Sequence, residues 1–164
     1  MKTKPALFSA NELLNAYSNK TMSPVEATKA ILDHIKNYDK KLNSFRLVDE
    51  EKALESARAS EERWSMGTPA GLVDGVPTTI KDLVATKGWS TRRGSLTTND
   101  KGPWKEDAPL VARLRSNGAV LLGKTTTPEF GWKGVTDSPL TGITRNPWDL
   151  TKTPGGSSGG AAAA

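Results

Sequence analysis

The sequence predicts an α/β protein whose N-terminal part is mainly helical. Residues 1–70 contain helix-start signals, each followed by apolar residues at the spacing of one helix face. After Gly71 the composition changes, and two β-prone runs, residues 76–81 and 119–123, enclose a helix signal that begins at Asp107. Because a strand, a helix and a strand follow one another, we expect residues 71–164 to begin an α/β core with a right-handed βαβ crossover. With 164 residues, the chain is long enough for a single domain with a real core.

Three helices and one strand are predicted in the first part of the chain. Ser9 and Glu12 match a capping box, and Pro24 stands at the first position of a second helix, where proline is favoured. The second helix carries its apolar residues on one face. Residues 43–48 alternate in polarity like a short strand, and Asp49 can then cap the third helix.

The second part of the chain mixes strands with long irregular stretches. Residues 76–81 are β-prone, and residues 86–100, rich in Gly, Ser, Thr and Arg, are interpreted as a long ordered loop. Gly118 ends the next helix. Residues 119–123 are a continuous apolar run, which indicates a buried strand, and the chain from there through Trp148 is expected to be mostly irregular.

The most informative stretch is residues 154–160, where four glycines surround the adjacent serines Ser157 and Ser158. Alanines follow at residues 161–164, so we interpret the stretch as a tight loop that brings both serines to a helix N-terminus. Three functions fit such a loop: a flexible linker, an anion cradle, or a serine site for covalent or relay chemistry. The third requires a base elsewhere in the chain.

Composition excludes several classes of site. The chain has no cysteine, which rules out disulfides, zinc-thiolate sites and cysteine nucleophiles within these residues. The net charge is +5, but the basic residues are scattered and no basic patch with interleaved aromatics is found, so no nucleic-acid partner is expected. No segment resembles a signal peptide or a membrane span, and we expect a cytoplasmic protein without a membrane partner.

Residues 118–125 match the P-loop pattern of nucleotide-binding proteins. That motif needs a strand before it, a loop within it and a helix after it. Here a helix precedes it, its centre is a buried strand, and Pro128 interrupts any following helix. A nucleotide-binding module is therefore kept only as a remote alternative.

A serine nucleophile needs a base, and two candidates can be weighed. His34 is the only histidine, and it stands beside charged residues on the second helix, so a Ser-His-Asp triad is rejected within these residues. A lysine with a lowered pKa is the remaining option. Lys81 follows Ile80 at the end of a core strand, which favours it over the other lysines. The structural alternative for Lys81 is an ion pair with Asp82.

Residues 76–82 together with residues 155–160 resemble the amidase signature family. Further matches lie at residues 93–95, 118–124 and 146–148, and with the helical N-terminus the resemblance covers nearly the whole chain. It implies a large mixed sheet flanked by helices and a Ser–cis-Ser–Lys triad, without any metal or organic cofactor. Lys81 matches the lysine base, and Ser157 matches the bridging serine, which follows a cis peptide bond.

The resemblance also implies what lies around these residues. Gly155, Gly156 and Ser158 belong to the supporting loop. Phe130, Gly131 and Trp132 follow Pro128 in a segment that lines the acyl pocket in the family, although core packing would explain them equally. The acyl-accepting serine lies one helix and one loop beyond the serine pair, after Ala164.

The function implied by the resemblance is hydrolysis of non-peptide amide bonds in a small-molecule substrate. We expect residues 1–164 to be the N-terminal part of one amidase signature domain, and to be inactive without the acyl-accepting serine. A homo-oligomer is left open. The alternative is the A subunit of a tRNA-dependent amidotransferase. Such subunits usually carry a Met-Asp-Glu-Phe-like segment where this chain has residues 127–130, which favours the stand-alone amidase.

Overall fold

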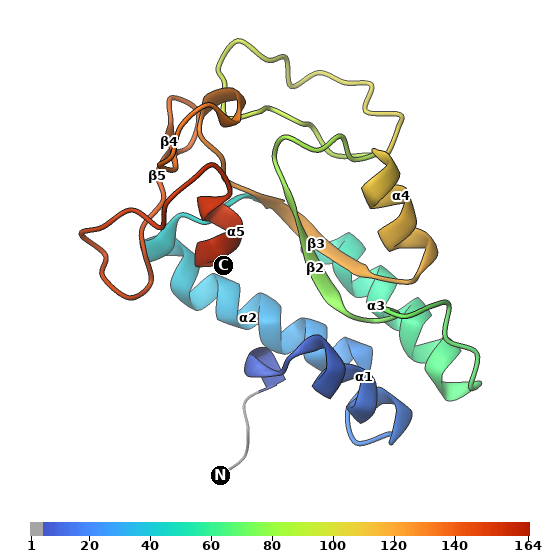
Figure 1. Ribbon diagram of the computed structural model, residues 1–164. Helices are drawn as coiled ribbons and strands as arrows, with labels where there is room; N and C mark the ends of the chain where they lie inside the picture. Colours follow the sequence, from blue (N-terminus) through green and yellow to red (C-terminus); the bar gives the residue numbers. More distant parts are fainter. Residues whose placement is uncertain (1–4) are drawn as a thin grey trace. The chain divides into compact units, whose positions relative to one another are not determined.

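A computed structural model describes residues 5–164 of the chain (Figure 1). The α-helices are α1 (Ala10–Ser18), α2 (Pro24–Leu42), α3 (Glu50–Ser65), α4 (Pro109–Ser116) and α5 (Gly159–Ala163), with short 3-10 helices η1 (Pro5–Leu7) and η2 (Glu129–Gly131). The strands are β1 (Phe45–Val48), β2 (Pro77–Lys81), β3 (Val120–Thr125), β4 (Asp137–Ser138) and β5 (Gly142–Ile143). The predicted order of the α-helices and of β1, β2 and β3 is confirmed.

The residues gather into two compact units. Among the described residues, the first unit consists of residues 5–36, Asp49–Thr78 and Ala112–Leu122. The second consists of Asn37–Val48, Thr79–Val111 and Gly123–Ala164. Each unit therefore combines segments that are distant in the sequence.

Helix caps in the first unit form as the sequence predicts. Ser9 and Glu12 make a reciprocal capping box, in which the Glu12 backbone N–H donates to Ser9 Oγ and the Ser9 backbone N–H donates to Glu12 Oε2. Ser23 and Glu26 repeat this pattern at the start of α2. These contacts satisfy N–H groups that a helix N-terminus leaves without partners.

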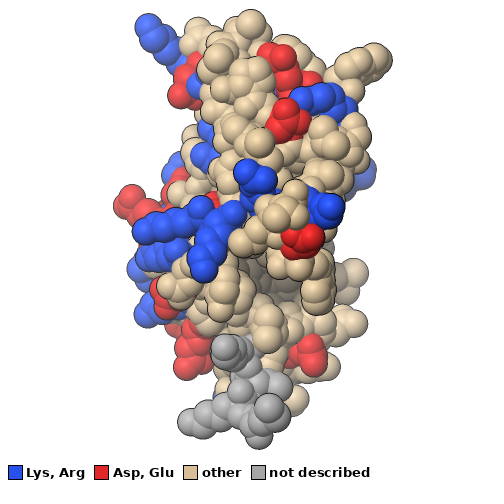
Figure 2. Space-filling model, turned by 90° about the vertical axis from the view of Figure 1, so that its left-hand side faces the viewer, with Lys and Arg blue, Asp and Glu red and all other residues tan. Residues whose placement is uncertain are grey.

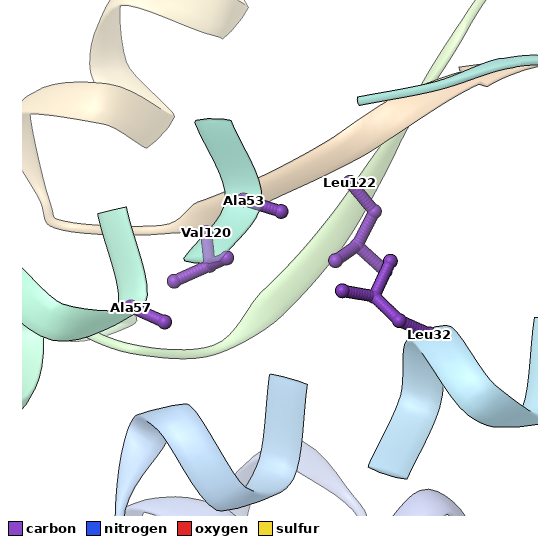
Figure 3. Packing of buried hydrophobic residues seen from close by; sticks show 5 residues of the cluster. All are labelled: Leu32, Ala53, Ala57, Val120 and Leu122. Atoms are coloured by element: carbon purple, nitrogen blue, oxygen red, sulfur yellow. The ribbon is translucent and has the colours of Figure 1, made fainter. Parts of the chain in front are cut away.

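The core of the first unit packs two helices against part of β3. Leu32 of α2 points toward Leu122 of β3, while Ala53 and Ala57 of α3 lie beside Val120 (Figure 3). All five residues are buried. The small alanine side chains allow the backbone of α3 to lie close to the strand.

The main sheet has the strand order β1-β3-β2. β1 runs antiparallel to β3, with Phe45 opposite Thr125 and Val48 opposite Gly123. Between β2 and β3, the Val120 N–H donates to the Val76 carbonyl, and beyond the end of β2 the Asp82 N–H donates to the Thr125 carbonyl. In these two bonds the residue numbers increase in the same direction along both segments, so β2 and β3 run parallel. Together with the antiparallel pair of β1 and β3, this makes the sheet mixed.

Burial differs between the two parallel strands. All six residues of β3 are buried, as the apolar run predicted, and this strand occupies the centre of the P-loop match, where a phosphate-binding loop would be required. In β2 only Ile80 is buried. The segment that was expected to be irregular also contains the short antiparallel pair β4 and β5, whose two-residue strands are too short to leave a clear pattern in the sequence.

Charges of both signs are exposed on the protein. Figure 2 shows Lys and Arg side chains next to Asp and Glu side chains on one face. Among the described residues, no helix is both long enough and apolar enough to cross a bilayer.

Candidate active site

Lys81 and the serine pair meet in the second unit. Lys81 is the last residue of β2, and its Nζ atom donates hydrogen bonds to Ser157 Oγ at 2.8 Å and to Ser158 Oγ at 2.9 Å. Burial of the ammonium group lowers the pKa of Lys81 below the ordinary value for lysine. A lowered pKa makes loss of the ammonium proton easier, and the resulting amine would be in hydrogen-bond contact with a hydroxyl, as a lysine base requires.

The backbone of the loop that carries the serines adopts the conformations predicted from its glycines. Gly155 has a φ of +84°, in the left-handed region that glycine adopts readily. The peptide bond between Gly156 and Ser157 is cis, as predicted. Ser158 stands at the N-cap of α5, so the expected delivery of the serine pair to a helix N-terminus is confirmed.

Three glycines of this loop lie against neighbouring backbone or threonine atoms. A Cβ atom on Gly156 would lie 2.7 Å from the Val135 backbone nitrogen. On Gly159 or Gly160 it would lie 2.2 Å or 2.4 Å from the nearest threonine Oγ1. Side chains at these positions would collide, so the glycines allow the loop to sit directly on the segments that precede β4 and follow β3.

Two threonines bond to the backbone of the loop. The Thr136 hydroxyl donates to the Gly155 carbonyl at 2.8 Å and accepts from the Gly159 N–H at 3.0 Å. Thr127 Oγ1 lies 3.3 Å from the Ser157 carbonyl oxygen and 3.2 Å from that of Pro128. Neither threonine was predicted from the sequence, because a threonine in an irregular segment carries no signal for a partner that is distant in the chain.

Asp82 is paired with residues other than Lys81. Its carboxylate lies 2.8 Å from Arg46 Nε and 3.8 Å from Lys124 Nζ, and Lys124 is completely buried. The alternative interpretation of Lys81, as the ion-pair partner of Asp82, does not match this geometry. Arg46 and Lys124 were not predicted as partners, since both come from strands whose pairing the sequence did not reveal.

Lys124 is held by several oxygens besides Asp82. Its Nζ donates to the Val84 carbonyl and to the hydroxyls of Thr86 and Thr91. Burial lowers the pKa of Lys124 to about 8, an effect that Asp82 opposes and Arg46 reinforces. These bonds fix the chain that follows β2, directly after Lys81.

The candidate pocket residues lie at and after η2. Phe130 and Trp132 line a cavity of about 650 Å³ together with Glu129, Lys133, Asp137, Ser138 and Pro139. Phe130 is 51% exposed and Trp132 is 89% exposed, so neither is a core residue. Gly131 packs close to Leu83, where a Cβ atom would lie 2.6 Å from a methyl carbon. Contact of these residues with a substrate remains a prediction.

The described residues contain no cluster of three or more His, Cys, Asp or Glu side chains that could hold a metal ion. At the loop itself, the lysine and the serine hydroxyl groups can transfer protons. A neutral amine can take a proton from a serine, and a serine between the amine and a second hydroxyl can pass a proton along.

Comparisons with known proteins agree with one another. The family model described as Amidase matches residues 26–164. The A subunit of glutamyl-tRNA(Gln) amidotransferase from Salinispora tropica is 43% identical over 157 residues, which make up 96% of this chain and 32% of that protein. The same protein from Clostridium botulinum is 42% identical over 158 residues, again 96% of this chain and 32% of that protein.

Solved structures show the same fold. A bacterial aryl acylamidase of the amidase signature family has a TM-score of 0.85 and 35% identity, covering 95% of this chain and 32% of its own. The peptide amidase from Stenotrophomonas maltophilia has a TM-score of 0.88 and 30% identity, covering 96% of this chain and 34% of its own. The chain thus spans about a third of the length of these proteins.

Proposed function

The chain belongs to the amidase family, and from this premise we propose that it supplies the lysine base and the relay serine of an amide hydrolase. The observation that carries the proposal is the pair of hydrogen bonds from Lys81 Nζ to Ser157 and Ser158, made by a partly buried lysine with a lowered pKa. The proposed substrate is a small molecule with a non-peptide amide bond, and no cofactor takes part.

The proposed reaction passes one proton along three groups. Neutral Lys81 accepts the Ser157 hydroxyl proton, and Ser157 accepts the proton of the acyl-accepting serine, which the family resemblance places after Ala164. That serine oxygen bonds to the amide carbonyl carbon, the C–N bond breaks, and the protonated lysine returns the proton through Ser157 to the leaving amine. Water then cleaves the acyl ester, and both serines and the lysine are restored.

A second candidate is the A subunit of a tRNA-dependent amidotransferase. It is favoured by the curated relatives at 42–43% identity, which carry the name of the glutamyl-tRNA(Gln) amidotransferase A subunit. The solved structures at 30–35% identity are amidases, which favours the stand-alone enzyme. Hydrolysis of an aryl amide by the purified family domain, without any other protein, separates the two, because the amidotransferase works as a complex and the stand-alone enzyme needs no partner.

The test is substitution of Lys81 in a protein that joins this chain to the rest of the family domain. Lys81→Ala should abolish hydrolysis of an aryl amide while leaving the circular dichroism spectrum unchanged, because the amine is proposed as a base and not as packing. In the unsubstituted enzyme, the rate should fall as pH falls and Lys81 gains its proton. The midpoint should lie below about 10.4, the ordinary lysine value.

Two controls accompany this test. Lys36→Ala removes a lysine from an exposed pair with Glu50 and should leave turnover unchanged. The 164-residue chain alone should be inactive, since in this proposal it carries no acyl-accepting serine. Near-normal turnover with Lys81→Ala would refute the role of Lys81 as the base. Activity of the isolated chain that disappears in Ser157→Ala would mean that Ser157 itself is the nucleophile.

A further inference from the structure

The Thr136 hydroxyl bonds to both sides of the serine pair. It donates to the Gly155 carbonyl, two residues before Ser157, and accepts from the Gly159 N–H, the residue after Ser158. The side chain is 1% exposed, so water does not compete for these bonds. From this contact we infer that Thr136 is the positioning residue that holds the serine pair against Lys81. The inference rests on the proposed function of that site.

The chemistry of the contact requires a hydroxyl group. One partner is an acceptor and the other a donor, and among small side chains only a hydroxyl can serve both with a single atom. The Gly159 N–H belongs to the first residue of α5, where helix N–H groups have no partner within the helix. A methyl group in place of the hydroxyl would leave this buried N–H unsatisfied.

The close approach depends on Gly159. A Cβ atom at this position would lie 2.2 Å from Thr136 Oγ1, so only glycine allows the contact. Thr136 is itself held in place by a backbone bond, because the Thr144 N–H donates to the Thr136 carbonyl. Support therefore passes from the Thr144 backbone through Thr136 to the serine loop.

Thr127 is a weaker candidate for the same role. Its hydroxyl has one proton, which two carbonyl oxygens share at 3.2 Å and 3.3 Å, and one of these belongs to the adjacent Pro128. It reaches the loop at the Ser157 carbonyl alone. Thr136 makes two shorter bonds and connects the two ends of the serine pair, so its loss should move both hydroxyls away from Lys81.

The test measures two quantities by NMR in the 164-residue chain: the exchange rate of the Gly159 amide proton and the pH titration of Lys81. In Thr136→Val, which keeps the side-chain shape, Gly159 exchange should become roughly tenfold faster, as expected for one lost hydrogen bond. Lys81 should titrate at higher pH, because a displaced loop lets water reach its ammonium group. Thr136→Ser restores the hydroxyl and should return both signals to their original values.

Thr144→Val is the matched control. It removes an equally buried threonine hydroxyl from the same unit, but one that bonds to Asn43 and Thr126 instead of the loop, so Lys81 should titrate as in the unsubstituted chain. Equal Lys81 titration in Thr136→Val and the unsubstituted chain would overturn the inference. If Thr136→Val does not fold, the inference is tested on the unsubstituted chain alone. Fast exchange of its Gly159 amide proton would then overturn the inference.

Neither measurement depends on turnover. If Lys81→Ala keeps its activity while Thr136→Val still shifts the Lys81 titration, the positioning role holds and the proposed base is wrong. If Thr136→Val changes neither the Gly159 exchange rate nor the Lys81 titration while Lys81→Ala is inactive, the role of Lys81 as base is supported and the positioning role of Thr136 is refuted.

Discussion

The glycines of the serine loop serve two different physical purposes. Gly155 adopts a positive φ and has open space where a side chain would stand, so the backbone conformation is the reason for glycine there. At Gly156, Gly159 and Gly160 the reason is contact, because neighbouring atoms occupy the place of a Cβ atom. A run of glycines that looks like a flexible linker in the sequence is therefore a tightly seated loop.

Gly159→Ala tests this difference. Alanine is the better helix former and Gly159 begins α5, so propensity alone predicts a gain in stability. The collision with Thr136 Oγ1 predicts the opposite, a loss of about 1–3 kcal/mol from overpacking. Urea unfolding followed by circular dichroism measures the sign. Gly134→Ala is the control, since no atom lies within 4 Å of its Cβ position, and a Gly159→Ala chain as stable as this control would contradict the argument.

The key side-chain pair could be predicted from the sequence, but its surroundings could not. Lys81 was identified because it follows a buried residue at a strand end, and the pair of Ser157 and Ser158 because of the glycines around it, whereas the family resemblance alone singled out Ser157. Lys124 occupies a similar position at the end of β3, yet it is completely buried and bound to Asp82 and three other oxygens. Burial of a lysine depends on which segments cover it, and that information is not local.

At the scale of helices and strands, local sequence signals predicted where helices begin, whereas the pairing of strands could not be predicted from the sequence. Helix caps such as Ser9 and Asp49 form within a few residues, so the sequence predicts them directly. The antiparallel pairing of β1 with β3 joins residues about eighty positions apart, and no pattern in either strand specifies its partner. The mixed character of the sheet was expected from the family resemblance alone.

A buried ion pair links α3 to the chain that leads into β2. Arg63 near the end of α3 bonds through two nitrogens to Asp74, at 2.6 Å and 2.8 Å, and the Asp74 carboxylate also accepts from the Ala70 N–H. Burial raises the pKa of Asp74, but the hydrogen bonds from Arg63 and Ala70 outweigh it, and the pKa lies below its usual value. The pair should therefore stabilise the first unit in its charged form.

Asp74→Asn should destabilise the chain by about 3 kcal/mol at pH 7, the lower end for removing one partner of a buried pair, because the Arg63 side chain is 30% exposed. The folded-state pKa is depressed, so this contribution is present above the unfolded value of about 3.9 and disappears as pH falls through the folded-state pKa. Urea unfolding at several pH values measures both effects.

The comparison variant is Asp137→Asn, which breaks the exposed pair with Lys133. That pair should contribute only about 0.2–1 kcal/mol. A cost for Asp74→Asn no larger than this, or one that does not shrink in acid, would show that the Asp74 pair does not hold α3 to the following chain.

At the scale of the whole molecule, the distribution of large apolar side chains is uneven. Trp89 is 4% exposed, while Trp132 and Trp148, also in the second unit, are 89% and 94% exposed. Exposed aromatic side chains mark a surface that binds another polypeptide only where they form a contiguous patch. Composition alone did not indicate which of the five tryptophans would lie on the surface. The chain itself spans about a third of the length of its relatives.

Acrylamide quenching of tryptophan fluorescence tests this distribution. The folded chain should contain a readily quenched and a protected population. Trp148→Phe should reduce the first and Trp89→Phe the second, because quenching requires contact with solvent. Loss of the readily quenched population as protein concentration rises would indicate that copies of the chain associate through these exposed tryptophans, the homo-oligomer that the sequence left open. Equal quenching of all tryptophans at every concentration would contradict the exposures on which the argument rests.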